Sequence, residues 1–265
     1  MEKLELPMGK NNYLMINPDY FEDIKVELED FLYGEDGLNS KDFVRKILFN
    51  QEIKTNNAVE GINNDLLIIE NVIKNNLMIG NDKKRREIIN LYNGYKYIFT
   101  NNIMDKEHLL ELYKILSDGL LSSSDMARMG EYYREDKVYI LRKGRIDMEL
   151  SEGIDYSLID KYMDIYFDYV NDNSDKTMTD EFIKSQIMHF YFVYIHPYFD
   201  VNGRSSRTMA MWYLLNNKAY PYIIFNRAIS NNSSTYDETI TDTRNNANIS
   251  FFIRYMMINV KRELE

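Results

Sequence analysis

The chain has 265 residues, of which 45% are hydrophobic, and this length predicts one large domain with room for a small appendage. Its net charge of −10 argues against non-specific binding to nucleic acid or to an anionic membrane, because both need a basic face. The absence of cysteine excludes disulfides and cysteine-ligated zinc, and the polar start without a long apolar stretch favours a cytoplasmic protein.

Helical periodicity dominates the chain. We predict helices over residues 19–33, 40–52, 64–79, 83–100, 105–118, 155–171, 179–195, 203–217, 234–245 and 248–262. Two of these helices have clear N-terminal signals: Asp105 precedes an apolar periodic run, and Thr177 stands three residues before Asp180, which is capping-box spacing. The helices divide into an N-terminal helical segment over 1–45 and a main domain over 46–262.

One segment departs from the helical pattern. The residues Val138, Tyr139, Ile140 and Leu141 alternate weakly between faces and are followed by a turn-like Arg-Lys-Gly-Arg sequence. This pattern predicts a short β-hairpin over 138–146, with a plain surface connection as the alternative. We therefore expect an all-α fold with one short hairpin.

The most informative stretch is a polar loop between two apolar helical runs, with the sequence HPYFDVNGRSSR from His196 to Arg207. A helix opens near Gly203, where backbone N–H groups lack partners within the helix and readily bind an anion. Arg204 and Arg207 share one face of that helix, where their charge opposes the helix dipole. A bound phosphate would account for both arginines, because a guanidinium fork fits phosphate with two hydrogen bonds.

Two further side chains complete the chemistry of this loop. Asp200 would repel a phosphate directly, but it fits as a ligand of a divalent cation such as Mg²⁺ that phosphate oxygens also hold. His196 is the group in the loop that can take a proton near neutral pH. The loop therefore indicates phosphoryl or nucleotidyl transfer onto a hydroxyl. The alternative is a capped loop whose arginines pair with surface carboxylates.

The loop resembles the signature of the Fic family, HPFx[DE]GNGRxxR, and departs from it at two positions. Tyr198 replaces phenylalanine, and Val201 replaces glycine. Because a β-branched residue disfavours positive φ, we expect either an ordinary turn with negative φ at Val201 or an altered phosphate site. The resemblance implies a Fic-type helical domain over 46–262 with a short hairpin near the active site.

A second segment, TNNAVEGI over 55–62, resembles the inhibitory helix of the same family, [ST]xxxE[GN]. Its glutamate, Glu60, and the glycine after it fit the pattern, whereas Asn56 stands where the family has serine or threonine. The resemblance implies an inhibitory helix around 53–63 whose Glu60 pairs with Arg207 and displaces the γ-phosphate of ATP.

The resemblance also implies the activity and its residues. Members of the family are protein adenylyltransferases, which transfer AMP from ATP to a Tyr, Thr or Ser hydroxyl. The implied catalytic residues are His196, Asn202 and Arg204, and the implied ATP-binding residues are Asp200, Val201, Asn202, Gly203, Arg204, Arg207 and Tyr236. Asp200 would hold Mg²⁺ or Mn²⁺. The hairpin residues Val138, Tyr139, Ile140 and Leu141 fall where the family has a flap that aligns a target peptide by backbone pairing.

Other functions remain open from the sequence. Three alternatives keep the same fold: the protein removes AMP from a modified protein, transfers another phosphate-containing group, or binds nucleotide as an interaction module without catalysis. A metal hydrolase built on His189, His196 and Asp200 is more distant, because His189 fits better as a packed, hydrogen-bonded core residue. The expected partners are ATP, a protein with an acceptor hydroxyl (including the chain itself) and further copies in a homo-oligomer.

Overall fold

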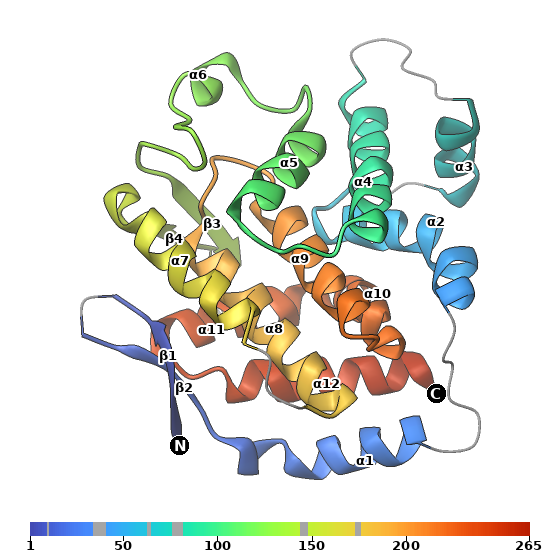
Figure 1. Cartoon of the computed structure of the whole chain (residues 1–265), viewed down its shortest axis with the longest axis vertical. Coiled ribbons are helices and arrows are strands. Elements are labelled where there is room, and N and C mark those ends of the chain that lie inside the picture. The colour runs from blue at the N-terminus through green and yellow to red at the C-terminus, as the bar shows by residue number, and fades with distance from the viewer. Residues whose placement is uncertain (10, 34–40, 63–64, 76–81, 144–147, 173–175) are drawn as a thin grey trace.

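The computed structural model describes residues 1–9, 11–33, 41–62, 65–75, 82–143, 148–172 and 176–265 (Figure 1). In the first half of the chain the elements are β1 (Glu2–Pro7), β2 (Tyr13–Ile16), η1 (Pro18–Tyr20), α1 (Glu22–Tyr33), α2 (Lys41–Val59), α3 (Leu66–Asn75), α4 (Lys83–Thr100), α5 (Lys106–Ser117) and α6 (Ser123–Met126). They continue as β3 (Tyr139–Lys143), β4 (Met148–Glu152), η2 (Tyr156–Leu158), α7 (Ile159–Val170), α8 (Met178–Ile195), α9 (Asn202–Asn216), η3 (Tyr220–Ile224), α10 (Phe225–Asn231), α11 (Ser233–Asn246) and α12 (Ser250–Leu264). The helical class is confirmed.

The centre of the fold is the antiparallel pair α8 and α9. Figure 1 shows these helices in the middle of the molecule, with α4 and α5 on one side and α12 and α1 on the other. Every residue from Lys184 to Ile195 in α8 and from Arg204 to Leu215 in α9 is buried. Because both helices are covered on all sides, the loop that joins them is anchored at each end to the core.

The helix ends follow the predicted capping signals. The Asp105 side chain accepts a hydrogen bond from the backbone N–H of His108 at 2.8 Å, and Thr177 with Asp180 forms a reciprocal capping box. The helix predicted over 83–100 has those bounds in α4, where the Asp82 side chain caps the first turn. Strong local signals of this kind therefore located the helices well.

The predicted hairpin is confirmed, and the plain surface connection is wrong. Strands β3 and β4 pair antiparallel, with Tyr139 opposite Glu152 and Leu141 opposite Leu150. The part of the predicted turn over 144–146 lies outside the described residues. The backbone N–H of Gly153 donates to the Val138 carbonyl at 2.9 Å and closes the open end of the hairpin.

The N-terminal segment differs from the prediction of a helical segment over 1–45. Strands β1 and β2 form an antiparallel pair ahead of α1. Partly buried Leu4 and buried Leu6 alternate with exposed Lys3 and Glu5, which is a strand pattern that the helical periodicity elsewhere obscured. Backbone hydrogen bonds join Met15 to Ala247 and Ile249, so the hairpin lies against the start of α12.

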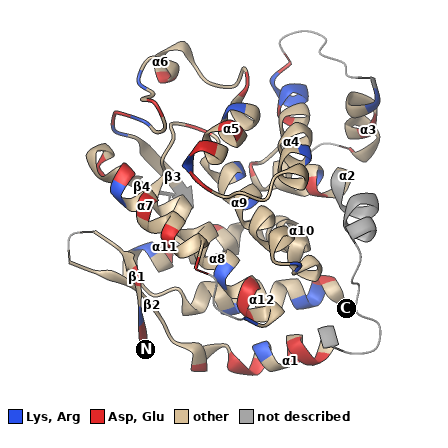
Figure 2. Ribbon diagram, viewed as in Figure 1, with Lys and Arg blue, Asp and Glu red and all other residues tan. Residues whose placement is uncertain are grey.

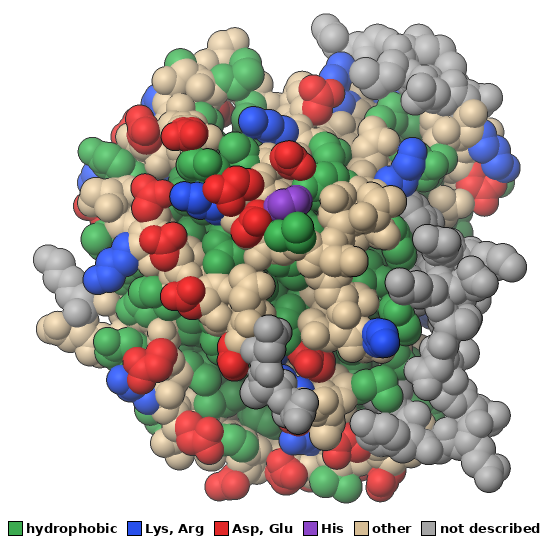
Figure 3. All heavy atoms as spheres, in the orientation of Figure 1, with side chains coloured by type: hydrophobic (Ala, Val, Ile, Leu, Met, Phe, Trp, Pro, Cys, Tyr) green, Lys and Arg blue, Asp and Glu red, His purple; other side chains and the backbone are tan. Residues whose placement is uncertain are grey.

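Two elements between α9 and α11 were not predicted. The segment η3 to α10 is apolar and buried but contains Pro221 and lacks a clear helical period. Charged residues lie mainly on the outer helices and loops, as Figure 2 shows, and acidic side chains are spread over the face seen in Figure 3. Among the described residues, no helix is both long and apolar enough to cross a bilayer.

Candidate active site

The loop between α8 and α9 begins at His196. This residue ends α8 in the left-handed conformation (φ 54°, ψ 60°), and its backbone N–H still donates to the Phe192 carbonyl at 3.0 Å. Pro197 prevents the helix from continuing, since a residue before proline is driven out of the α region. The chain therefore turns sharply at His196, which lines the main cavity of the region.

Arg134 fixes the backbone of this turn. Its buried guanidinium donates through Nε to the His196 carbonyl at 2.9 Å, through Nη1 to the Asp136 carbonyl at 2.6 Å and through Nη2 to the Ile154 carbonyl at 2.7 Å. Its own backbone N–H donates to the Pro197 carbonyl at 3.0 Å. One side chain thus joins the α8–α9 loop to the segments on both sides of the β3–β4 hairpin.

Val201 begins α9 in the left-handed conformation, with φ 66° and ψ 10°. The expectation of an ordinary turn with negative φ at Val201 is therefore wrong. The Asp200 carboxylate accepts the Val201 backbone N–H at 2.6 Å, and the Asn202 side chain both donates to and accepts from the backbone of Tyr198. These local hydrogen bonds shape the loop, so much of the hydrogen-bonding capacity of Asn202 is used within the chain.

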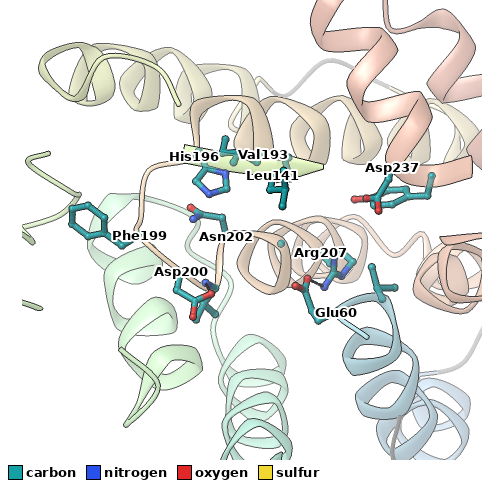
Figure 4. A pocket seen from close by; sticks show the side chains of 14 residues that line it. Glu60, Leu141, Val193, His196, Phe199, Asp200, Asn202, Arg207 and Asp237 are labelled. Atoms are coloured by element: carbon teal, nitrogen blue, oxygen red, sulfur yellow. Dashed lines mark hydrogen bonds and ion pairs between the residues drawn. The ribbon is translucent and has the colours of Figure 1, made fainter. Parts of the chain in front are cut away.

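A cavity of about 360 Å³ opens where α9 begins (Figure 4). It is lined by Val59, Glu60, Ile140, Leu141, Val193, His196, Phe199, Asp200, Val201, Asn202, Gly203, Arg207, Tyr236 and Asp237. The structure thus brings most of the predicted site residues together, from α2, the hairpin, the loop, α9 and α11. Arg204 does not line this cavity.

Arg207 and Glu60 form an ion pair within the cavity, drawn as a dashed contact in Figure 4. Glu60 Oε1 lies 2.5 Å from Arg207 Nη2, and a Cβ placed on Gly203 would lie 2.5 Å from the same carboxylate oxygen. The Glu60 carboxylate therefore rests against the first turn of α9, where the helix terminus favours an anion. Burial lowers the pKa of Arg207, but Glu60 together with Tyr236 and Tyr95 raises it, and the net shift of this pKa is upward.

Asn56 is a second contact of Arg207 from the same helix. Arg207 Nε donates to Asn56 Oδ1 at 2.9 Å, and Arg207 Nη2 lies 3.4 Å from the Asn56 carbonyl oxygen. The residue that departs from the family pattern therefore contacts the arginine directly. Its position in a buried network was not evident from the sequence.

Arg204 lies under the loop instead of in the cavity. Its Nη1 lies 3.4 Å from a carboxylate oxygen of Glu87 in α4, and its Nη2 lies 4.0 Å from Asp200 Oδ1. Both Arg204 and Glu87 are buried. Burial raises the pKa of Glu87, and the opposing effect of the Arg204 charge only partly offsets this rise. The sequence analysis did not predict a role for Glu87, because no pattern in the neighbouring sequence indicates a contact with a residue in α9.

Tyr236 and His189 are packed together behind the cavity. His189 is fully buried, and its Nε2 lies 2.6 Å from the Tyr236 hydroxyl, as expected for a hydrogen-bonded core histidine. Tyr236 is among the residues that line the cavity. His189, His196 and Asp200 do not come together as the metal site that the hydrolase alternative needs.

Asp200 is the candidate metal ligand. Its side chain is about half exposed and lines the cavity beside His196. Within the part of the chain that the structure describes, no group of three His, Asp or Glu side chains could hold a metal ion by itself. A single carboxylate that shares the ion with phosphate oxygens and water fits the way Mg²⁺ binds.

Comparisons with known proteins agree with this architecture. Residues 103–214, which run from α5 through the whole loop to near the end of α9, match the sequence model of the Fic/DOC family. A Fic family protein from Desulfovibrio desulfuricans G20 has a similar structure, with a TM-score of 0.74, 19% identity, and coverage of 94% of this chain and 74% of that chain. A fragment of Fic-1 from C. elegans gives a TM-score of 0.62 with 13% identity, over 93% and 71% of the two chains.

The search of curated proteins gives no match. The chain therefore has the Fic fold, and residues 103–214 match the Fic/DOC sequence model. Glu60 and Asn56 lie outside that matched segment, so their part in the site depends on the contacts described above.

Proposed function

We propose that the protein is an adenylyltransferase that transfers AMP from ATP to a Tyr, Thr or Ser hydroxyl of a protein and that Glu60 holds it inactive. Fic domains in general transfer phosphate-containing groups such as AMP to proteins. The observation that carries the proposal is the shared cavity, in which His196, Asp200 and Arg207 surround the N-terminal turn of α9. The chemistry of these three side chains suits a base, a metal ligand and a phosphate-binding cation, and this supports an anion site at that turn.

The proposed reaction joins the acceptor oxygen to the α-phosphorus and breaks the bond from that phosphorus to the bridging oxygen, so that pyrophosphate leaves. His196 takes the proton of the acceptor hydroxyl. Backbone N–H groups at Asn202 and Gly203 stabilise the charge that develops on the α-phosphate. Arg207 binds the γ-phosphate once Glu60 has left it. Arg204, which lies under the loop 4.0 Å from Asp200, supports the position of that side chain.

Asp200 would hold Mg²⁺ or Mn²⁺, and a bound ion would neutralise charge on the phosphates and on the departing pyrophosphate. The acceptor would lie along the hairpin, where Tyr139 and Leu141 are exposed. Strand β3 offers backbone pairing to an extended peptide there. The target is a protein with an accessible hydroxyl, and a second copy of this chain meets that requirement.

Labelled ATP with Mg²⁺ tests the proposal. We expect label on the protein or an added partner, abolished by His196→Ala and raised on the order of 10- to 100-fold by Glu60→Gly. The rise follows because a charge-assisted contact is worth about 1.5–3 kcal/mol. Lys54→Ala, on an exposed position of α2, is the matched control. Full activity in His196→Ala would remove the base assignment, and unchanged kinetics in Glu60→Gly would remove the inhibitory role.

A second function is favoured by the place of Glu60 itself. A carboxylate beside the phosphate position could orient a water molecule, so that the same site would remove AMP from a modified protein. Chromatography of the nucleotide products separates the two: transfer releases pyrophosphate, whereas removal releases AMP. An interaction module without catalysis would bind ATP and release neither product, even in the Glu60→Gly variant.

A further inference from the structure

Helix α2 holds Arg207 at two places that differ in charge and exposure. Glu60 lies directly after the last residue of the helix, and about a third of its side chain is exposed. Asn56 lies one turn earlier, is fully buried, and accepts the Arg207 Nε–H at 2.9 Å. The exposed carboxylate can turn away from the arginine, whereas the buried amide is held in place.

The orientation of the Asn56 amide is fixed from its other side. Asn56 Nδ2 lies 2.7 Å from the hydroxyl of Tyr95, a fully buried residue of α4. Because the amide nitrogen is directed to Tyr95, the amide oxygen is directed to Arg207. The three residues form a buried chain from α4 through α2 to α9.

The neutrality of Asn56 decides what this contact does. A carboxylate cancels the charge of Arg207, but an amide oxygen holds Nε and leaves the charge in place. Arg207 also lines the cavity, and its Nη2 donates to the Glu60 carboxylate there. A phosphate that replaced Glu60 would therefore meet an arginine already held in position.

We propose that Asn56 is a positioning residue for Arg207, so that helix α2 forms part of the nucleotide site as well as closing it. This inference rests on the proposed function, in which Arg207 binds the γ-phosphate. Activation then requires the Glu60 side chain to move while α2 stays docked. The buried contact of Glu52 with Asn226 of α10, at 2.8 Å, holds the helix in that place.

The test compares ATP with ADP, because only ATP carries the γ-phosphate. Dissociation constants for both nucleotides with Mg²⁺ are measured by calorimetry in the Glu60→Gly background. We expect ATP to bind more tightly than ADP in this background. Asn56→Ala should weaken ATP binding about tenfold and leave the dissociation constant of ADP nearly unchanged. Lys54→Ala in the same background keeps the preference. A general loss of folding would weaken the binding of ATP and of ADP to the same extent.

Asn56→Asp provides a second variant that keeps the size of the side chain. A carboxylate at residue 56 would cancel the charge of Arg207, so we expect the preference for ATP to fall toward that of the protein with Glu60 intact. If ATP binds better than ADP but both Asn56 variants keep that ratio, the inference is overturned and the proposed function stands. If neither nucleotide binds to the Glu60→Gly protein, both are overturned.

Discussion

Val201 shows how burial and backbone strain compete at a single residue. A left-handed backbone costs a non-glycine residue about 1–2 kcal/mol. Burying a valine side chain gains about 1.5–3 kcal/mol, and only 3% of Val201 is exposed. The expectation of negative φ at Val201 was wrong because it considered only the cost of the backbone conformation and not the gain from burying the side chain. The turn keeps its shape, and the side chain compensates by packing in the core.

Paired substitutions separate these two effects. At an ordinary helical position alanine is more stable than glycine by about 1 kcal/mol, but a left-handed position reverses that order. We therefore expect the free energy of unfolding in urea to be about 1 kcal/mol higher for Val201→Gly than for Val201→Ala. Val193 is equally buried within α8, and there the alanine variant should be the more stable. The same order at both positions would show that Val201 carries no strain.

At the level of elements, local signals in the sequence predicted more than contacts between distant segments. Gly61 follows Glu60 and adopts positive φ, and backbone N–H groups of Gly61 and Ile62 bond to the carbonyls of Ala58 and Asn57. This is the glycine-terminated helix end that the Glu-Gly pair indicates. The helix predicted over 40–52 instead continues to Val59 and ends at this glycine, so the local pattern missed its last seven residues and Glu60 was expected only from the family resemblance.

The supports beneath the site could not be predicted in this way. Glu87 and Arg134 meet their partners only after α4, the hairpin and the α8–α9 loop have packed together. Neither residue belongs to a pattern with a fixed spacing to its partner. A single sequence gives their chemistry but not their neighbours, so their roles had to come from the structure.

Arg134 leads to a prediction about the β3–β4 hairpin. Arg134→Met removes hydrogen bonds to three carbonyl groups, whereas Arg134→Lys keeps the charge but cannot reach all three. We expect the Gly153 amide to exchange with deuterium faster in both variants, while amides of α12 are unchanged. Arg254→Met, which removes a surface ion pair with Asp23, is the control. Unchanged protection at Gly153 would show that the hairpin is held by other contacts.

At the scale of the whole molecule, one buried acid joins α2 to the rest of the fold and makes the stability of the protein depend on pH. Glu52 is buried in the core, and burial raises its pKa to about 8, although the Asn226 hydrogen bond and Arg207 oppose this. In the unfolded chain a glutamate titrates near 4.3, so the folded protein binds this proton more tightly. Stability from Glu52 is therefore full below about pH 4.3 and is lost as pH rises toward 8.

Glu52→Gln tests this dependence, because glutamine resembles the protonated acid and does not titrate. The free energy of unfolding in urea is compared between wild type and variant at about pH 5 and about pH 8. We expect the wild type to lose roughly 1–3 kcal/mol more than the variant over that interval, since each unit of pH costs up to about 1.4 kcal/mol. Other titrating groups are common to both proteins and cancel in the difference. Parallel curves would mean that Glu52 is ionised in the folded protein at neutral pH, with its charge balanced by Arg207 across the α2–α9 contact.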